Sequence, residues 1–202
     1  MNRRIPAARS RRDPPDTGRF RIIGGRWRGR RLVFPALAGV RPTGDRVRET
    51  VFNWLQPLIG GARCLDLYAG SGALGLEALS RGAAHTTFLD NYLPSARQID
   101  AHLQLLGCDR ALVQQADALQ WLQQAPAAAF DIVFVDPPFQ LDLWQPCLQQ
   151  LETGGWLREE ALVYVETPRG YPLAAPAAWE LLREKQAGEV CFRLYRRATT
   201  LE

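Results

Sequence analysis

The sequence is poor in lysine, methionine and histidine, and it lacks any long run of apolar residues. Its 202 residues include one lysine, one methionine and two histidines. His85 and His102 fall in an expected turn and an expected helix, with no ligand cluster at metal-binding spacing, so we predict no metal. Because no segment approaches the roughly twenty apolar residues of a membrane span, and the N-terminus lacks the apolar stretch of a signal peptide, we expect a cytoplasmic protein.

Cysteine is sparse and dispersed as well. Cys64, Cys108, Cys147 and Cys191 form no C-x-x-C pair, which is typical of reduced core thiols in a cytosolic protein. Apolar residues make up 47% of the chain, and its length suits one domain with a small appendage. We therefore expect a globular protein, and we predict that it is a monomer.

The basic residues are concentrated at the start of the chain. Residues 1–48 hold 14 arginines and 3 acids, a net charge of +11, whereas residues 49–202 hold 11 basic and 18 acidic residues, a net charge of −7. A basic arm on an acidic body is typical of proteins that bind nucleic acid through its phosphates. Arginine also stacks and binds phosphate bidentately, which suits RNA. We expect a disordered basic tail (1–18), a basic β-hairpin for RNA contact (19–40) and a catalytic domain (41–202).

The hairpin is predicted from two apolar segments, 20–23 and 31–34, that flank a glycine-rich and arginine-rich turn containing Trp27. An aromatic side chain among arginines is suited to RNA, although packing of Trp27 against the domain explains the pattern equally well. The next segment, 45–58, has apolar residues at helical spacing, and Arg46 and Arg48 lie off that stripe, where they can face phosphates or a cofactor. We predict RNA contacts at Arg26, Trp27, Arg28, Arg30, Arg41 and Arg46.

Apolar runs then alternate with helical patterns, which indicates a doubly wound α/β sheet with right-handed crossovers. The count gives seven strands, mostly parallel, with a closing antiparallel hairpin at the C-terminus. The expected helices are 73–81, 93–106, 119–124 and 141–151. The expected strands are 63–68, 86–89, 111–113, 132–135, 162–166, 179–186 and 189–196.

A glycine-rich segment, 66–72, lies at the first turn from strand to helix, where α/β folds bind cofactors. Gly70, Gly72 and Gly75 fit G-x-G-x-x-G, and Asp90 follows about twenty residues later, so a nicotinamide dinucleotide is one candidate ligand. S-adenosylmethionine is the other. It carries a sulfonium, an ammonium and no phosphate, and a cation favours acids around it.

Three acids follow three successive strands of the predicted sheet. Asp66 could accept from the methionyl ammonium, directly or through water, Asp90 could hold the ribose hydroxyls, and Asp117 could accept from the adenine amino group. Each could instead cap a helix, and for Asp117 capping is as good an explanation. We predict that the donor contacts Asp66, Tyr68, Gly70, Ser71, Gly72, Asp90, Asn91, Asp117, Ala118 and Thr43.

The tetrapeptide Asp136-Pro137-Pro138-Phe139 ends an apolar strand about seventy residues after the glycines. A carboxylate (Asp136) and a carbonyl oxygen (Pro137) can accept the two N–H groups of a nucleobase amine, which turns its lone pair toward a methyl donor. Two prolines stiffen this loop and offer no competing N–H, and Phe139 can stack on an unpaired base. An ordinary turn is the alternative explanation, but the position at a strand end favours a site.

These residues resemble the bacterial 16S ribosomal RNA guanine N2-methyltransferases, which modify one guanine of the small ribosomal subunit. The resemblance covers about residues 19–197 and rests on four segments: 21–30, 41–49, 66–82 and 136–139. It implies a Rossmann-like class I methyltransferase fold, S-adenosylmethionine as donor, and 16S rRNA in the small subunit as substrate. Family members usually have Glu at the ribose position and a second acid two residues later, where this chain has Asp90 and Tyr92.

Three other functions fit parts of the pattern. Adenine N6 methylation uses the same tetrapeptide and the same fold. A NAD-dependent oxidoreductase fits the glycines but lacks an obvious partner for hydride transfer, and the placement of the acids argues against it. A non-catalytic RNA-binding factor would use the basic arm alone.

Overall fold

A seven-stranded sheet forms the centre of the molecule in a computed structural model that describes residues 17–35 and 44–198. The strand order is β5-β4-β3-β6-β7-β9-β8; neighbouring strands from β5 to β7 are parallel, and β9 runs antiparallel to both β7 and β8. The predicted mostly parallel sheet with a C-terminal antiparallel hairpin is confirmed. The strands are β3 (Arg63–Asp66), β4 (His85–Asp90), β5 (Ala111–Gln115), β6 (Phe130–Val135), β7 (Leu157–Pro168), β8 (Trp179–Ala187) and β9 (Val190–Arg197).

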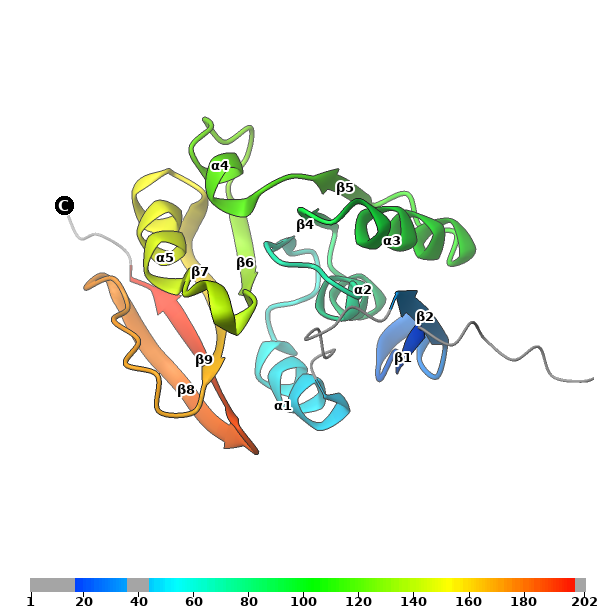
Figure 1. Cartoon of the computed structure of the whole chain (residues 1–202), viewed down its shortest axis with the longest axis horizontal. Coiled ribbons are helices and arrows are strands. Elements are labelled where there is room, and N and C mark those ends of the chain that lie inside the picture. Colours follow the sequence, from blue (N-terminus) through cyan, green and yellow to red (C-terminus); the bar gives the residue numbers. More distant parts are fainter. Residues whose placement is uncertain (1–16, 36–43, 199–202) are drawn as a thin grey trace, which may run out of the picture.

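Five α-helices cover the two faces of this sheet (Figure 1). The side chains of α1 and α2 pack with one face of the sheet, and α3 joins the same side through Phe88, whereas α4 and α5 pack against the opposite face. The helices are α1 (Asp45–Leu55), α2 (Ala73–Ser80), α3 (Leu93–Leu105), α4 (Ala118–Leu122) and α5 (Trp144–Thr153), and two short 3-10 turns are η1 (Gly25–Trp27) and η2 (Phe139–Leu141).

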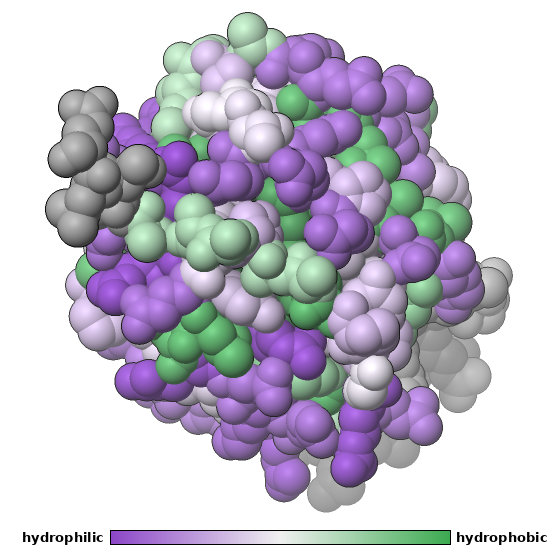
Figure 2. Space-filling view, turned by 90° about the vertical axis from the view of Figure 1, so that its left-hand side faces the viewer, coloured by the Kyte–Doolittle hydropathy of each residue, from purple (hydrophilic) through white to green (hydrophobic). Residues whose placement is uncertain are grey.

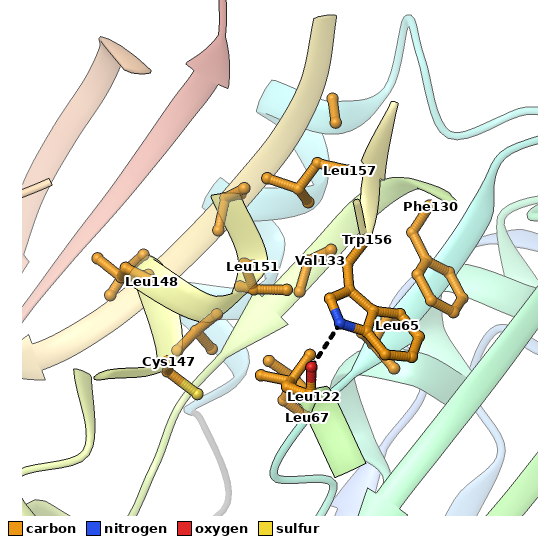
Figure 3. Close-up of a cluster of buried hydrophobic side chains, with 14 of the residues drawn as sticks. Leu65, Leu67, Leu122, Phe130, Val133, Cys147, Leu148, Leu151, Trp156 and Leu157 are labelled. Carbon is orange, nitrogen blue, oxygen red and sulfur yellow. Dashed lines mark hydrogen bonds between the residues drawn. The ribbon is translucent and has the colours of Figure 1, made fainter. Parts of the chain in front are cut away.

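The core between α5, α4 and the sheet is apolar and tightly packed (Figure 3). Leu65, Val133 and Leu148 are each 0% exposed. Trp156 stacks on Trp121 with 4.1 Å between ring centroids, and its indole N–H donates to the carbonyl oxygen of Leu122 at 2.9 Å. The buried indole N–H of Trp156 thus has a hydrogen-bond partner, and this bond fixes the position of α4 on the sheet.

Helix α1 is shorter than the predicted helix 45–58. It begins after Gly44 with Asp45 in the first turn, where an acid is favourable, and it ends at Leu55, two residues before Pro57, which has no backbone N–H to continue the helical hydrogen bonds. Val51 is fully buried as expected, but Leu58 lies beyond the helix and is 57% exposed. Trp54 stacks on Phe192 at 5.3 Å, in agreement with a core position.

The N-terminal hairpin is a separate two-stranded sheet, with β1 (Thr17–Arg21) paired antiparallel to β2 (Arg31–Pro35). Phe20, Ile22, Leu32 and Phe34 are buried against α2 and α3. The predicted β-hairpin is confirmed, and its first strand begins at Thr17, two residues before the expected start. The remainder of the predicted tail, residues 1–16, lies outside the described residues.

The edge strand β8 is protected from pairing with another sheet by its side chains. The exposed side chains on it include Glu180, Arg183, Glu184 and Lys185, and charged side chains disfavour edge-to-edge association.

Figure 2 shows the side of the molecule on which α5 and the C-terminal strands lie, where hydrophilic side chains are interspersed with small hydrophobic areas. No helix within residues 17–35 and 44–198 is long and apolar enough to cross a membrane.

Candidate active site

The glycine-rich loop and the Asp136 loop leave neighbouring strands at the same edge of the sheet. Strands β3 and β6 are parallel partners, with Asp66 opposite Phe134. The strand order reverses between them, since β4 and β5 lie on one side and β7 on the other. Crevices at the carboxyl ends of strands at such a switch point are the usual ligand sites of open α/β sheets.

The glycine loop has a conformation that favours glycine. Gly70 has φ +50° and Gly72, which precedes α2, has φ +77°, and both lie in the left-handed region. Gly75 allows close packing instead, because a Cβ there would collide with the ring of Phe88 on β4. Ser71 is buried between the two loop glycines. The loop is therefore fixed before any ligand arrives.

Asp66 supports this loop from behind. Its carboxylate accepts the backbone N–H of Gly75 at 3.0 Å, and the side chain is 2% exposed. Burial raises the pKa of Asp66 to about 7, the Gly75 bond opposes this shift, and the charge of Asp90 adds to it. Asp66 therefore braces the loop, and its buried position does not favour the predicted direct contact with an ammonium group.

Asp90 joins the glycine loop to the end of β4. One carboxylate oxygen accepts the N–H of Gly70 at 2.7 Å and the other accepts the N–H of Tyr92 at 2.8 Å. Burial raises the pKa of Asp90, while these two bonds lower it. Each oxygen can accept a second hydrogen bond. Asn91 and Tyr92 are exposed beside it.

The third acid has a clear structural role. Asp117 is the N-cap of α4, and its side chain accepts the N–H of Gln120 at 2.9 Å. Ala118 is 4% exposed, so it can offer a ligand only limited contact. Tyr68 packs against the same core, and its hydroxyl lies 3.1 Å from the sulfur of Cys147. Thr43, the last predicted donor contact, lies outside the described residues.

The acids also discriminate between the two candidate ligands. A dinucleotide places its pyrophosphate on the backbone N–H groups of the glycine loop and the helix start. Here the N–H of Gly70 and the N–H of Gly75 already donate to carboxylates. Those carboxylates would repel a phosphate, and they favour a cation. The geometry therefore fits S-adenosylmethionine and argues against NAD.

The loop after β6 is more exposed than the glycine loop. Pro137 is buried, whereas Pro138 and Phe139 are exposed, and the ring of Phe139 is 36% exposed. The carbonyl oxygen of Pro138 accepts the N–H of Leu141 at 3.0 Å and closes the η2 turn. Asp136 is half-buried at the strand end. This loop presents a carboxylate and an aromatic face next to the donor loop.

Three buried residues near the Asp136 loop were not predicted from the sequence. The hydroxyl of Tyr164 donates to the carboxylate of Glu166 at 2.6 Å, and both side chains are buried on β7 beside β6. Burial raises the pKa of Glu166. The indole of Trp144 donates to the carbonyl of Glu166 at 2.7 Å and lies 5.8 Å from the ring of Phe139. Glu166 could have been identified from the sequence, because it is an acid directly after an apolar run within the strand.

The predicted RNA contacts have separate outcomes. Arg26, Arg28 and Arg30 are exposed on the hairpin turn, and Arg46 is exposed on α1, while Arg41 lies outside the described residues. The predicted RNA contact of Trp27 is wrong. Its side chain is 6% exposed in the core with α2 and α3, because the hairpin folds back onto the domain, so its ring is not available to a base.

A buried carboxylate holds the hairpin in this docked position. Glu77 of α2 is 0% exposed, and it accepts the backbone N–H groups of Ile23 at 2.8 Å and Gly24 at 2.7 Å. Arg81 donates to it at 2.7 Å, and Arg48 lies 3.6 Å away. The expectation that Arg48 faces a phosphate or the cofactor is therefore wrong, since it is 0% exposed within this cluster.

Metal ligands are not gathered anywhere in the described part of the chain. No group of three or more histidine, cysteine, aspartate or glutamate side chains there could hold an ion. The four cysteines are free, and three of them are buried.

Comparisons with known proteins agree with this geometry. The family model described as "Conserved hypothetical protein 95" matches residues 20–196. Ribosomal RNA small subunit methyltransferase D of Escherichia coli K12 is 50% identical and covers 90% of this chain and 91% of its own length, and the Haemophilus influenzae protein of that name is 47% identical and covers 90% and 96%. A solved structure of yhhF from Escherichia coli superimposes with a TM-score of 0.84 at 49% identity, covering 91% of this chain and 100% of that one.

These similarities confirm the predicted α/β methyltransferase fold, and they support S-adenosylmethionine as the donor that this enzyme class uses. The match to the family model spans nearly all of residues 17–198, including both loops of the candidate site. The chain belongs to the conserved hypothetical protein 95 family, the family of the ribosomal RNA small subunit methyltransferases D.

Proposed function

We propose that this protein transfers a methyl group from S-adenosylmethionine to the exocyclic N2 of one guanine in the 16S rRNA of the small ribosomal subunit. The observation that carries the proposal is the position of the Asp136 loop beside the glycine loop, on the paired strands β6 and β3. The family adds ribosomal RNA as the substrate class, because its named relatives are ribosomal RNA small subunit methyltransferases.

The donor supplies an electrophilic methyl group on a sulfonium, and the loops after β3 and β4 would hold it. The backbone of Gly70 and Gly72 forms the floor of that site, Asp90 is placed for the ribose hydroxyls, and Asp117 lies at the third strand end. Asp66 braces the loop through the N–H of Gly75. Together these groups would bind and orient a cationic donor beside the Asp136 loop.

The acceptor is activated by geometry. The guanine amine is a poor nucleophile because its lone pair is delocalised into the ring, and acceptance of its two N–H groups by Asp136 and the carbonyl of Pro137 turns that lone pair toward the methyl carbon. The nitrogen–carbon bond would form as the carbon–sulfur bond of the donor breaks, and the electron pair of that bond would go to sulfur. The proton lost from the cationic nitrogen passes to the Asp136 carboxylate or to water. Phe139 stacks on the base, which must leave the RNA stack to reach the site.

We also propose a monomer that binds RNA through the exposed arginines 26, 28, 30 and 46. The charged edge of β8 supports this state, because it discourages association of two sheets. Size-exclusion chromatography with light scattering tests it; a stable dimer would contradict the proposal.

Methyl transfer is tested with labelled S-adenosylmethionine on three acceptors: small subunits that lack the modification, naked 16S rRNA and DNA. Digestion to nucleosides then identifies the product, and we expect N2-methylguanosine from the subunits. N6-methyladenosine would establish the same fold acting on the other amine. Label on none of the acceptors, despite measurable donor binding, would overturn the assignment to ribosomal RNA.

A further inference from the structure

We propose that Arg19, Arg21 and Arg31 form a phosphate-binding site for the RNA backbone on the outer face of the hairpin, distinct from its turn. A hollow of about 310 Å³ lies on this face, lined by Arg19, Phe20, Arg21, Arg31 and Asp45. The proposal takes its ligand, RNA, from the proposed function, but the reaction itself is not needed to test it.

The alternation of side chains along the hairpin creates this arginine face. Phe20 of β1 and Ile22 just after it, with Leu32 and Phe34 of β2, point into the core against α2 and α3. The intervening arginines of both strands must therefore point outward, and Arg19, Arg21 and Arg31 are all exposed. One face of the hairpin anchors it, and the other gathers positive charge.

Two of these arginines lie directly opposite each other. The register of the antiparallel pair places Arg21 against Arg31. Like charges at opposed positions destabilise a sheet, so this pairing costs stability in the free protein. A bound phosphate between the two guanidinium groups would convert that repulsion into two charge-assisted hydrogen bonds. Such a ligand would stabilise the opposed arginines beyond the offset that the Asp45 contact of Arg21 provides.

Two buried side chains, Arg48 and Glu77, fix the position of the strand that carries Arg21. Arg48 is fully buried beneath the hollow, stacks over the ring of Phe20 at 5.4 Å and donates to the backbone carbonyl of Arg21 at 2.9 Å. This contact fixes the strand that carries Arg21. Because Glu77 anchors the same strand end through Ile23 and Gly24, the arginine face has a fixed orientation relative to α2 and the glycine loop.

Among the described residues that line this hollow, Asp45 is the acid. Its carboxylate lies 3.5 Å from Arg21 and accepts from Arg48 at 2.6 Å. In the free protein it offsets part of the charge of the cluster, and a phosphate would compete with it for Arg21. The structure therefore predicts opposite effects for the two kinds of charge removal: loss of an arginine weakens RNA binding, and loss of Asp45 strengthens it.

The first experiment measures RNA binding of Arg21→Gln/Arg31→Gln against salt concentration. The probes are an unmodified 16S rRNA transcript and a duplex RNA of unrelated sequence. Each phosphate contact contributes roughly 0.7–0.9 to the slope of log affinity against log salt, so the double variant should reduce the slope by about 1.4–1.8 on both probes. Arg31→Glu and Arg183→Glu form a matched pair, since both reverse one exposed strand charge, and only the first should weaken binding.

Asp45→Asn supplies the opposite arm, and the asparagine oxygen can still accept from Arg48. Tighter RNA binding at low salt is expected. A wild-type salt slope for the double variant, or weaker binding by Asp45→Asn with an unchanged melting temperature, would overturn the site. Methylation is measured separately: if wild-type protein forms no N2-methylguanosine but the salt slope still falls, the proposed function fails and this site stands.

Discussion

The two loops at the carboxyl edge of the sheet use their acids in opposite ways. After β3 and β4, Asp66 and Asp90 accept hydrogen bonds from the backbone of the glycine loop, and Asp66 is 2% exposed. After β6, the loop is stiffened by two prolines, and it leaves Asp136 half-buried and Phe139 exposed. The difference teaches that the donor half is held rigid by its acids, whereas the acceptor half offers an acid to a substrate. Substitutions in the first half should lower stability, and substitutions in the second should lower turnover.

The largest effect is expected for Glu77→Ala, which removes another buried acid with a structural role, in the helix that follows the glycine loop. It leaves the buried Arg48 and two backbone N–H groups without their carboxylate, and removal of one partner of a buried ion pair costs about 3–5 kcal/mol. Urea unfolding measures this loss. Glu77→Gln keeps the acceptor oxygen and should lose less stability, and equal losses in both variants would show that the charge contributes nothing.

Asp136→Ala should reduce turnover about 10²–10³-fold, the usual cost of removing one oriented group from the transition state. Donor binding should stay near its wild-type value, because the carboxylates that hold the glycine loop are those of Asp66 and Asp90. Single-turnover methyl transfer and calorimetric titration of the donor measure the two quantities. Normal methylation by this variant would rule out the mechanism.

Asp66 should make stability depend on pH. Its pKa is raised to about 7 by burial, so between about pH 4 and pH 7 the folded state binds more protons than the unfolded state, and stability falls as pH rises. The fall is at most about 1.4 kcal/mol per pH unit and ends above pH 7. Asp66→Asn, which can still accept from Gly75, should flatten this profile in urea unfolding at pH 5 and pH 7.5. The same slope in both proteins would contradict the role of burial.

Phe139→Ala tests the acceptor half again, with a smaller effect. Loss of one base–aromatic stack costs about 1–3 kcal/mol, so kcat/KM for small subunits should fall roughly 5- to 150-fold. Phe139→Tyr keeps the ring and should stay near wild type. Phe139 is 36% exposed and covers part of the buried Trp144, 5.8 Å away, so the free energy of unfolding should fall less than kcat/KM does. A large loss of stability with unchanged kcat/KM would reverse the comparison.

The sequence predicted the strands and the two loops because each is encoded locally, by apolar periodicity and by glycine or proline. It left the burial of Trp27 open and did not predict that of Arg48, because both depend on how a hairpin docks on α2, a contact between segments more than fifty residues apart. Glu77 was missed for the same reason, since within a helical pattern it resembles any surface acid. The end of α1 at Leu55 could have been predicted from Pro57, because a proline has no backbone N–H with which to continue a helix.

The smallest effect separates the two roles of Asp117. As an N-cap it accepts from Gln120, and Asp117→Ala should cost about 1 kcal/mol of stability, whereas Asp117→Ser retains a capping oxygen and should cost less. If Asp117 also accepts from the adenine amino group, the serine side chain is too short to reach it, and donor affinity should fall in both variants. Affinity that follows stability, lost in alanine and kept in serine, would assign Asp117 to the fold alone and leave Asp90 as the acid that contacts the donor.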